Sequence, residues 1–518
     1  MAEYKVFIPT SGIGSRLGEI TKYTNKSLVR VGKKPAISYI IENYPKHTEF
    51  VVSVGYYGDH VQQFLKLTYP DIKFEYVEVD KYDGEGSSLL YSISKAKKYL
   101  NCPFIFHACD TIVSPYNKEV ENNWIAGFKP TKNPEYRSFN VSQNNVTKIN
   151  DKGELSYDFD YVGIFGIKDY NIFWDTVDKL LPRQTNSSSD YDVINLMLNN
   201  NIKFEYKIFD FWYDIGNVSA LWNARENIKD KFHILDKNDE SIFIFDNFIV
   251  KFFYDQSVCD NRIKRANILN NLVPKIIDSS KNFYKYEYAK GELLSTVVNP
   301  QKITNLLNWT KSNLWTKLDR KKDFNKSCET FYFTKTKQRI DKFFKQNNLL
   351  DEEEMINGIL VPKISDLLNN LDIELFCNVD SYKFHGDFIL DNIIVDNDNF
   401  VLIDWRQDFA GDLLYGDIYY DLGKLNHNLI FNHDLVNKNN FTIKKTKNEI
   451  FCDILVSKNL LDCKEQLLQF CLENSFDYNK VELMSSIIWI NMAPLHNHPL
   501  DKFLYYFGKY NLFLNLKK

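Results

Sequence analysis

The segment HGDFILDN, residues 385–392, predicts the local structure and chemistry around it more specifically than any other short stretch of the chain. Two apolar runs, IIVD and FVLID, follow it on either side of an Asn-Asp-Asn turn, which predicts an antiparallel hairpin. A hairpin centred on Asp398 brings Asn392 opposite Asp404. Two oxygen ligands at the open end of a hairpin can hold Mg²⁺, and Asp387 stands on the loop beside them. The segment therefore predicts a phosphoryl-transfer site, with a carboxylate to orient or deprotonate a hydroxyl and metal ligands to bridge nucleotide phosphates.

The length of the chain predicts a second domain beside the one that carries this segment. At 518 residues it exceeds the roughly 250 to 300 residues at which a single hydrophobic core stops growing. A charged stretch, KDKFHILDKNDE at residues 229–240, separates a helical pattern from the β-rich segment SIFIFDNFIVKFF. We therefore expect two domains, at residues 1–235 and 240–518.

Composition and charge narrow the class of protein. Hydrophobic residues make up 44% of the chain and charged residues 25%, which is typical of globular proteins. The formal net charge of -4 gives no reason to expect a nucleic-acid partner. There is no signal-peptide pattern, no run of ~18 apolar residues and no metal or disulfide pattern among the eight cysteines. We expect a cytoplasmic protein with no membrane span and with reduced cysteines, while the oligomeric state is unknown from the sequence.

A glycine-rich loop follows the first predicted strand. The apolar strand YKVFIP runs into TSGIGSRLG, and a helix is predicted at PAISYIIENY. Gly12 and Gly14 let the backbone approach a bound group closely, so that amide N–H groups can donate hydrogen bonds to phosphate oxygens. Arg16 adds a positive charge, and Lys26 in TNKSLVRVGKKP lies close enough in sequence to add a second. The loop is therefore a candidate phosphate site.

The combination of SGIGSRL with NKSLV resembles the signature of nucleotidylyltransferases that join a nucleoside triphosphate to a sugar phosphate or a phosphorylated small alcohol. The resemblance implies a Rossmann-like α/β fold with a mixed sheet, in which the loop holds the triphosphate and Arg16 and Lys26 are catalytic. Thr10 and Ser11 stand where the family usually has other small residues before the first glycine. The segment YDGEGSSLL corresponds to the loop that contacts the nucleobase. The implied nucleotide-binding residues are Gly12, Gly14, Ser15, Arg16, Gly84, Gly86 and Ser87.

Two aspartates match the metal-binding positions of the same family. Asp110 ends the apolar strand PFIFHACD, in agreement with ligand sites beyond the carboxyl ends of strands in open α/β sheets. Asp214, in FWYDIGNVSALWNARE, stands where the sugar-nucleotide members carry their second metal aspartate. Two carboxylates from distant segments can hold one Mg²⁺ against the phosphates as pyrophosphate leaves. Gly163, in YVGIFG, matches the strand that contacts the acceptor.

The loop and hairpin at residues 385–404 resemble the aminoglycoside phosphotransferase and choline kinase family. The resemblance covers most of residues 240–518 and implies a two-lobed protein-kinase-like α+β fold, with lobes at about 240–290 and 291–518. It implies that Asp387 is catalytic. The Mg²⁺ ligands that it implies are Asn392 and Asp404.

Residues before the loop match the same family with one departure. Lys251, in FIVKFF, matches the family's phosphate-contacting lysine, and YEYAKGELL, with Glu287, resembles the nucleotide-binding hinge between the lobes. The following helix has no glutamate where the family usually carries the partner of this lysine, so that Lys251 pairs with Asp260 or with nothing. A degenerate kinase domain is therefore an alternative, which the intact catalytic loop disfavours. Asp408, after IDWRQ, is a candidate acceptor-binding residue.

The two predicted reactions compose in series, because a kinase makes a phosphate ester and a nucleotidylyltransferase consumes one. We expect phosphorylation of a sugar or polyol by ATP, followed by nucleotidylyl transfer to the product. The family resemblance implies that the product serves bacterial surface glycan (capsule or lipopolysaccharide) synthesis. Choline or ethanolamine in place of the sugar is the first alternative, and an active transferase beside a silent kinase-like module is the second. A Gln-Pro pair that reads uracil in some relatives is missing, which weakly disfavours UTP and leaves CTP or GTP open. CTP is our first expectation, with GTP or UTP as alternatives.

Overall fold

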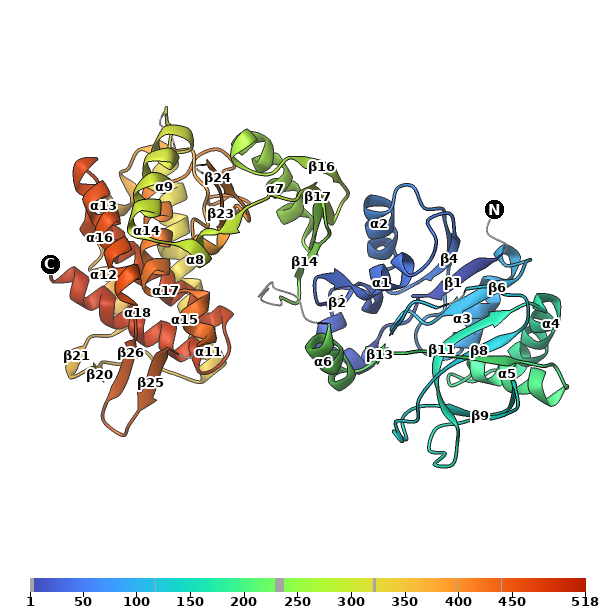
Figure 1. Cartoon of the computed structure of the whole chain (residues 1–518). Helices are drawn as coiled ribbons and strands as arrows, with labels where there is room; N and C mark the ends of the chain where they lie inside the picture. Colours follow the sequence, from blue (N-terminus) through green and yellow to red (C-terminus); the bar gives the residue numbers. More distant parts are fainter. Residues whose placement is uncertain (1–3, 117, 229–236, 320–322, 398, 439) are drawn as a thin grey trace. The chain divides into compact units, whose positions relative to one another are not determined.

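The computed structural model describes residues 4–116, 118–228, 237–319, 323–397, 399–438 and 440–518 (Figure 1). The chain divides into two compact units. The first consists of Met1–Cys259 and Ile277–Glu287, and the second of Asp260–Ile276 and Tyr288–Lys518. Every helix in the described residues is too short or too polar to cross a membrane.

A nine-stranded mixed sheet forms the centre of the first unit, in the order β5-β4-β1-β6-β11-β8-β12-β10-β9. Strands β5, β4, β1 and β6 are parallel, β11 runs antiparallel to β6 and β8, and β12 runs parallel to β8. The predicted Rossmann-like mixed sheet is thus confirmed. Its strands in chain order are β1 (Lys5–Pro9), β4 (Glu49–Val54), β5 (Phe74–Glu78), β6 (Phe104–His107), β8 (Trp124–Phe128), β9 (Ser138–Ser142), β10 (Asn145–Asn150), β11 (Phe159–Ile167) and β12 (Glu205–Ile208).

Helices cover both faces of this sheet because its strands alternate buried side chains between two apolar clusters. Val6 and Ile8 of β1 pack in one cluster with helices α1 and α2, while Phe7 packs in the other with α3, α4 and α5. Four short strands, β2, β3, β7 and β13, and helix α6 accompany the nine-stranded sheet. The bounds are α1 (Ala36–Glu42), α2 (Gly58–Thr68), α3 (Leu89–Lys95), α4 (Tyr170–Leu180), α5 (Asp190–Asn199), α6 (Val218–Asn227), β2 (Arg30–Val31), β3 (Lys34–Pro35), β7 (Thr111–Val113) and β13 (Trp212–Asp214).

A second sheet, of order β14-β15-β17-β16, packs against helix α2. The ring of Phe64 on α2 lies 5.4 Å from that of Phe243 and 6.0 Å from that of Phe283. The sequence predicts these strands as the smaller kinase lobe, at about 240–290, whereas the first compact unit takes in most of them and so continues past residue 235. Their origin in a kinase fold stays a prediction. The bounds are β14 (Glu240–Ile244), β15 (Phe248–Phe253), β16 (Ile276–Ser279) and β17 (Phe283–Glu287).

The second unit is mostly helical. Helices α14 and α17 approach closely at Gly423, where a Cβ atom would lie 2.5 Å from Met484 Cγ, and α17 packs in turn against α18. The helix α7 (Gln256–Leu269) enters this unit at Asp260. The other helices are α8 (Leu294–Val297), α9 (Pro300–Asn313), α10 (Phe324–Glu329), α11 (Lys335–Asn347), α12 (Ile364–Asn369), α13 (Ile373–Cys377), α14 (Ile418–Ile430), α15 (His433–Asn437), α16 (Lys458–Glu473), α17 (Tyr478–Met492) and α18 (Leu500–Leu516).

Three small sheets accompany these helices, in the orders β18-β23-β24, β19-β22 and β21-β20-β26-β25. The first of them contains the hairpin predicted after residue 392. The strands are β18 (Glu292–Leu293), β19 (Lys317–Leu318), β20 (Glu354–Ile356), β21 (Ile359–Val361), β22 (Ser381–Tyr382), β23 (Ile393–Asp396), β24 (Asn399–Leu402), β25 (Phe441–Lys445) and β26 (Ile450–Ile454).

Candidate active sites

The first candidate site lies where two short strands pair outside the main sheet. Strand β7 follows Asp110, and β13 ends at Asp214. The strands are antiparallel with Asp214 opposite Thr111, and the backbone N–H of Ile215 donates a 2.9 Å hydrogen bond to the carbonyl of Asp110. This pairing brings together two carboxylates that are far apart in the sequence.

Lys26 lies beside the first of these carboxylates, with Nζ donating to Asp110 Oδ2 at 2.7 Å. Its position depends on Asn25, a fully buried residue that the sequence analysis did not single out. The Nδ2 group of Asn25 donates to the carbonyls of Thr10 and Tyr56, both at 2.7 Å. Asn25 thus ties the lysine to the end of strand β1.

Burial and neighbouring charge set the ionisation of the three groups. Burial opposes the charged forms of Lys26 and Asp110, but their mutual attraction outweighs it: the pKa of Lys26 is raised and the pKa of Asp110 is lowered. For Asp214, burial and the charge of Asp110 together raise the pKa. A divalent cation placed between the two carboxylates would offset this mutual repulsion and favour the charged form of both.

The two carboxylates converge with Arg16 at Gly216. A Cβ atom on Gly216 would lie 2.9 Å from Asp214 Oδ1, 3.0 Å from a terminal nitrogen of Arg16 and 3.2 Å from Asp110 Oδ2. Mg²⁺ is usually bound through one or two carboxylates and completes its octahedron with water and substrate phosphates. Asp110 and Asp214 therefore fit this ion.

Replacing Gly216 by alanine should lower the rate of nucleotidylyl transfer roughly 100-fold, because a displacement of about 1 Å at a reacting centre costs that much. The added methyl group would push against both carboxylates and Arg16. The measurement is pyrophosphate release, with Ser219→Ala on the exposed first turn of α6 as the matched control. A wild-type rate in Gly216→Ala would contradict the convergence of the site at this glycine.

The glycine loop lies at the carboxyl end of β1. Gly14 has φ 72°, and a Cβ there would lie 3.0 Å from Lys26 Cβ, so both the backbone and the lysine favour glycine. Gly12, Ser15 and Arg16 are exposed in the same loop. The loop and the two cations thus lie beside the aspartate pair, and the roles assigned to them stay predictions.

The other predicted residues of this domain lie next to the same loop and turn. Residues 84–87 form a loop whose two glycines have φ angles of 73° and 81°. A Cβ on Gly55 would meet both the Tyr82 ring, at 2.9 Å, and a carbonyl of the glycine loop, at 2.7 Å, which places the two loops side by side. The carbonyl of Gly163 accepts a 3.0 Å hydrogen bond from the N–H of Ala108, on the turn that carries the first aspartate.

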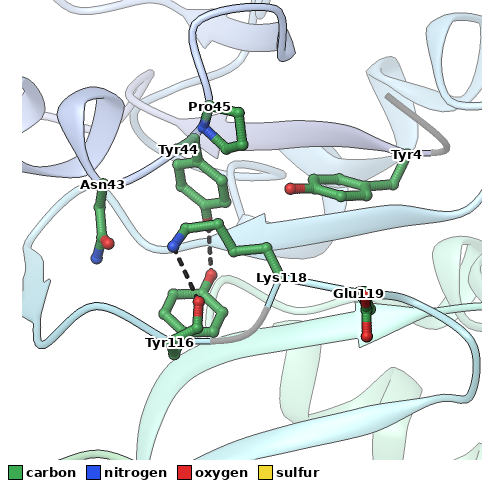
Figure 2. Close-up of a pocket in the computed structure, with 7 residues that line it drawn as sticks. All are labelled: Tyr4, Asn43, Tyr44, Pro45, Tyr116, Lys118 and Glu119. Carbon is green, nitrogen blue, oxygen red and sulfur yellow. Dashed lines mark hydrogen bonds between the residues drawn. The ribbon is translucent and has the colours of Figure 1, made fainter. Parts of the chain in front are cut away.

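A buried hydrogen-bonded chain leads from this turn to a pocket (Figure 2). Burial lowers the pKa of His107 to about 4, so the imidazole is neutral at pH 7. In this form Nε2 donates to the carbonyl of Thr111 at 3.1 Å, and Nδ1 accepts from the Tyr44 hydroxyl at 2.8 Å. The hydroxyls of Tyr44 and Tyr116 are 2.6 Å apart. The pocket has a volume of about 540 Å³ and is lined by Tyr4, Asn43, Tyr44, Pro45, Tyr116, Lys118 and Glu119.

Acid should therefore destabilise the first unit through His107. Burial lowers its pKa to about 4, below the value of about 6.5 for an unfolded histidine. The stabilisation is fully present above pH ~6.5 and is lost as the pH falls toward 4, by about 3 kcal/mol. Denaturant titrations at each pH should show a shallower loss of unfolding free energy for His107→Gln than for wild type. If the unfolding free energies of the two proteins fell equally with decreasing pH, the assignment of a buried neutral histidine would be wrong.

The second candidate site is built on the hairpin of β23 and β24. Ile393 pairs with Leu402, one residue away from the predicted register. The N–H of Ile403 donates to the carbonyl of Asn392 at 2.8 Å, so that Ile403, and not Asp404, lies opposite Asn392. The prediction was wrong because two residues, and not three, separate the strands.

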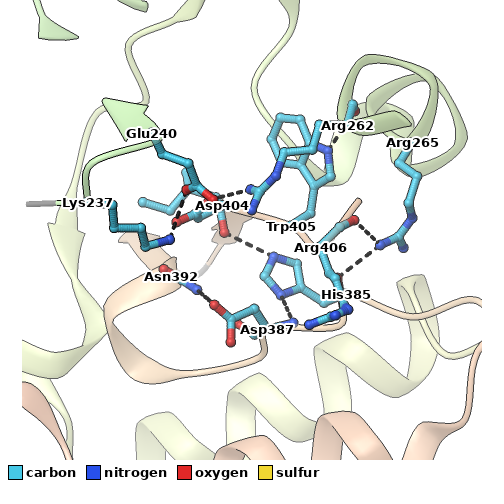
Figure 3. Close-up of polar contacts among 11 residues, drawn as sticks. Lys237, Glu240, Arg262, Arg265, His385, Asp387, Asn392, Asp404, Trp405 and Arg406 are labelled. Carbon is cyan, nitrogen blue, oxygen red and sulfur yellow. Dashed lines mark hydrogen bonds and ion pairs between the residues drawn. The ribbon is translucent and has the colours of Figure 1, made fainter. Parts of the chain in front are cut away.

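Asp387 lies on the loop before the hairpin (Figure 3). Its Oδ1 accepts from Lys424 Nζ at 2.7 Å, and its Oδ2 accepts from Asn392 Nδ2 at 3.1 Å. Burial alone would raise the pKa of Asp387, but the charge of Lys424 outweighs it and lowers the pKa to about 2. The carboxylate is therefore ionised at neutral pH and can accept a hydrogen bond from a hydroxyl. The sequence analysis did not single out Lys424, on α14.

Asp404 follows the hairpin with φ 54° and pairs with the guanidinium of Arg262 on α7 (Figure 3). The helix that lacks the expected glutamate thus presents an arginine to the predicted metal ligand. Among the described residues, no three His, Cys, Asp or Glu side chains cluster as metal ligands. A carboxylate from Asp404 and an amide oxygen from Asn392, completed by substrate phosphates, still fit Mg²⁺, which would compete with Arg262.

Buried side chains hold the loop before the hairpin in place. Asp421 accepts hydrogen bonds from the backbone N–H of His385 and of the glycine after it, at 2.8 and 2.7 Å, and burial raises its pKa to about 6. Arg265, which is 1% exposed, donates to the carbonyls of His385 and Arg406. Arg265 is not among the predicted site residues, although its spacing from Arg262 places both on one face of the helix.

The remaining predicted kinase residues lie on separate elements. Lys251 is a buried residue of β15 opposite Ile242 and Tyr284, and Glu287 is the exposed last residue of β17. Both belong to the first compact unit, and the pairing of the lysine with an acid on α7 stays a prediction. Asp408, in the second unit, accepts from the N–H of Gly411 at 2.9 Å and so stabilises its own turn.

Comparison with known proteins finds two kinds of similarity, one to a family model and one to curated proteins. Residues 343–434 match the model of the phosphotransferase enzyme family, and this range contains the loop and hairpin described above. The Bifunctional protein GlmU of Methanococcus maripaludis strain S2 is 23% identical over 252 residues, which are 46% of this chain and 59% of that protein. The GlmU of Methanococcus aeolicus is 26% identical over 240 residues, which are 43% of this chain and 55% of that protein. The chain spans little more than half the length of these curated relatives.

Solved structures give a likeness that is limited to part of the chain. The inositol-1-phosphate CTP transferase from T. maritima is 18% identical with a TM-score of 0.36, covering 45% of this chain and 99% of its own. The predicted fusion, of a nucleotidylyltransferase-like region with a phosphotransferase-family region, is confirmed by the relatives and the family match.

Proposed function

We propose that the protein is a bifunctional enzyme whose first unit transfers a nucleotidyl group to a phosphorylated small alcohol. The observation that carries this proposal is the convergence of Asp110, Asp214 and Arg16 at Gly216, with Lys26 bound to the first aspartate. An acceptor phosphate oxygen attacks the α-phosphorus of the triphosphate, the bond to the β-phosphate breaks, and pyrophosphate leaves. Arg16 and Lys26 offset the charge that develops on the phosphates.

The proposed reaction of the second unit is transfer of the γ-phosphate of ATP to the hydroxyl of that alcohol. The ionised Asp387 accepts the hydroxyl's hydrogen bond and orients its oxygen, while Lys424 and Asn392 hold the carboxylate in place. At both sites Mg²⁺, when bound, would neutralise phosphate charge and favour departure of the leaving group. The proposed ligands are Asp110 and Asp214 in the first site and Asn392 and Asp404 in the second.

A sugar or polyol is the proposed substrate, and surface glycan synthesis in a bacterium the proposed role. The WYDIG sequence, with Asp214, supports this choice through its resemblance to the sugar-nucleotide enzymes. CTP is the first choice of nucleotide for the transferase, with GTP or UTP as alternatives, and the proposed location is the cytoplasm. The discriminating experiment is a matrix of CTP, UTP, GTP and dTTP against phosphorylated sugars, polyols, choline and ethanolamine, scored by pyrophosphate release.

A second candidate function, an active transferase beside a silent kinase-like unit, is favoured by the ion pair of Arg262 with Asp404. In that case the guanidinium of Arg262 stays paired with Asp404, and this carboxylate does not bind Mg²⁺. Purified protein that binds ATP but transfers no phosphate to any alcohol would support this candidate. Transfer of phosphate that depends on Asp387 would exclude it.

A further inference from the structure

Four basic side chains gather around the loop of Asp387, and they are called the basic cluster here. Two come from helix α11, one follows strand β24 and one lies on helix α14. They come from three different segments, and the charges of the other three all act on the lysine at the start of α11. The basic cluster consists of Lys335, Arg339, Arg406 and Lys424.

Two of these cations lie against aromatic rings. Lys335 Nζ lies 3.8 Å from the ring centre of Phe331 and 5.8 Å from that of Tyr420, and the guanidinium carbon of Arg406 lies 5.0 Å from the ring centre of Phe331. Phe331 stacks on Phe409 at 4.2 Å. The ring of Phe331 belongs to a π-helical turn, Thr330–Thr334, a geometry that is frequent at functional sites.

Only one member of the basic cluster is neutralised by a carboxylate. Lys424 pairs with Asp387, whereas within the described part of the chain Lys335, Arg339 and Arg406 have no ion pair. Arg406 Nε donates to the backbone carbonyl of Asp408 at 3.0 Å, and Arg339 reaches only a backbone carbonyl at 3.5 Å. The nearby acids are too few to balance the cluster.

An uncompensated cluster of this kind is costly in the free protein. Burial and then the charges of Arg406 and Arg339 lower the pKa of Lys335 well below its usual value, with Asp408 opposing them weakly. Like charges that converge where they are partly buried are destabilising unless an anion joins them. The cost is explained if a negatively charged molecule binds there.

We propose that the alcohol phosphorylated at Asp387 carries its own anionic group, a carboxylate or a phosphate, which the basic cluster binds. This inference rests on the kinase function proposed above. The acceptor hydroxyl oxygen attacks the γ-phosphorus of ATP, the bond to the β-phosphate oxygen breaks, ADP leaves, and the hydroxyl proton passes to Asp387 and then to water. Choline and ethanolamine are disfavoured as acceptors, because cations already cover the Phe331 ring that would bind an ammonium group.

The test compares neutral and acidic acceptors of the same skeleton with the full-length protein. Glycerol, glycerate and glycerol 3-phosphate form one series, and glucose, glucuronate and glucose 6-phosphate form another, with choline as the cationic probe. ADP release should show kcat/KM at least roughly 10-fold to 100-fold higher for an acidic member than for its neutral partner, as expected for charge-assisted hydrogen bonds. Comparing the carboxylate acceptors with the phosphate acceptors shows which anionic group is preferred. Equal or better use of neutral acceptors or choline would overturn the inference.

A substitution in the basic cluster ties the preference to these residues. Lys335→Met should raise the KM for the acidic acceptor roughly 10-fold and leave the KM for ATP unchanged. Lys337→Met, an exposed lysine on the same helix, is the matched control and should change neither constant. If Lys335→Met changed the KM for ATP alone, the cluster would be a nucleotide site and the inference would be wrong.

Calorimetric binding of the same probes without ATP separates this inference from the kinase proposal. Tighter binding of acidic probes to wild type than to Lys335→Met, in a protein that transfers no phosphate, would retain the anion site and reject the kinase function. Acidic probes that bind no more tightly than neutral ones would reject the anion site even in an active kinase. An unfolding temperature for Lys335→Met that is no lower than that for Lys337→Met would show that misfolding does not explain the difference.

Discussion

Replacing Asp110 by asparagine should lower pyrophosphate release roughly 1,000-fold while phosphate transfer from ATP stays at the wild-type rate. The asparagine keeps the size of the side chain but removes the charge that holds Lys26 at 2.7 Å. The site then loses one of the two carboxylates proposed to bind Mg²⁺. The measurement is pyrophosphate release with the preferred triphosphate and phosphorylated acceptor, run beside a kinase assay on the same preparation.

An exposed aspartate in the same unit serves as the control for Asp110→Asn. Asp178 lies on helix α4 and pairs on the surface with Lys97, so Asp178→Asn should leave both activities unchanged. If Asp110→Asn released pyrophosphate at the wild-type rate, the assignment of a nucleotidylyltransferase site to this unit would be wrong.

Replacing Asp387 by asparagine should have the opposite effect. Phosphate transfer from ATP to the alcohol should fall roughly 100- to 10,000-fold, because an amide cannot take the hydroxyl proton and leaves Lys424 without its partner. Pyrophosphate release from a phosphorylated acceptor should be unchanged, because the residues assigned to that reaction lie in the first unit. A kinase assay with labelled ATP measures the first quantity.

A surface aspartate of the second unit provides the matched control for Asp387→Asn. Asp380 is half-exposed and pairs with Lys317, so its replacement by asparagine should leave the kinase rate unchanged. Wild-type phosphate transfer by Asp387→Asn would show that another group orients the hydroxyl.

Much of the first site could be predicted because short-range patterns determine it. A glycine loop after an apolar strand, and an aspartate at a strand end, are recognisable in the sequence itself. Asn25 was missed because its role is set by the carbonyls of Thr10 and Tyr56, which lie beside it only in the folded chain. The approach of Asp214 to Asp110 likewise depends on the pairing of β7 with β13, which the sequence does not reveal without a family resemblance.

The kinase-like half shows where local patterns are insufficient. The apolar runs correctly predicted a hairpin, but the register depended on a turn that is one residue shorter than expected. Lys424 and the basic cluster come from helices that the chain folds back onto the loop, and no periodicity marks such contacts. The burial of β15 did leave a signal in the sequence, the nearly continuous apolar run FIVKFF, and the structure buries its last five residues, as in a strand covered on both faces.

The central claim, that the two activities act in series on one compound, is tested most directly by a single incubation. The full-length protein receives ATP, the preferred nucleoside triphosphate and the free alcohol, and pyrophosphate is followed over time. The account predicts release after a lag, complete dependence on ATP and on Asp387, and recovery of the Asp387→Asn variant when the phosphorylated alcohol is supplied. Release from the free alcohol by Asp387→Asn at the wild-type rate would contradict the account.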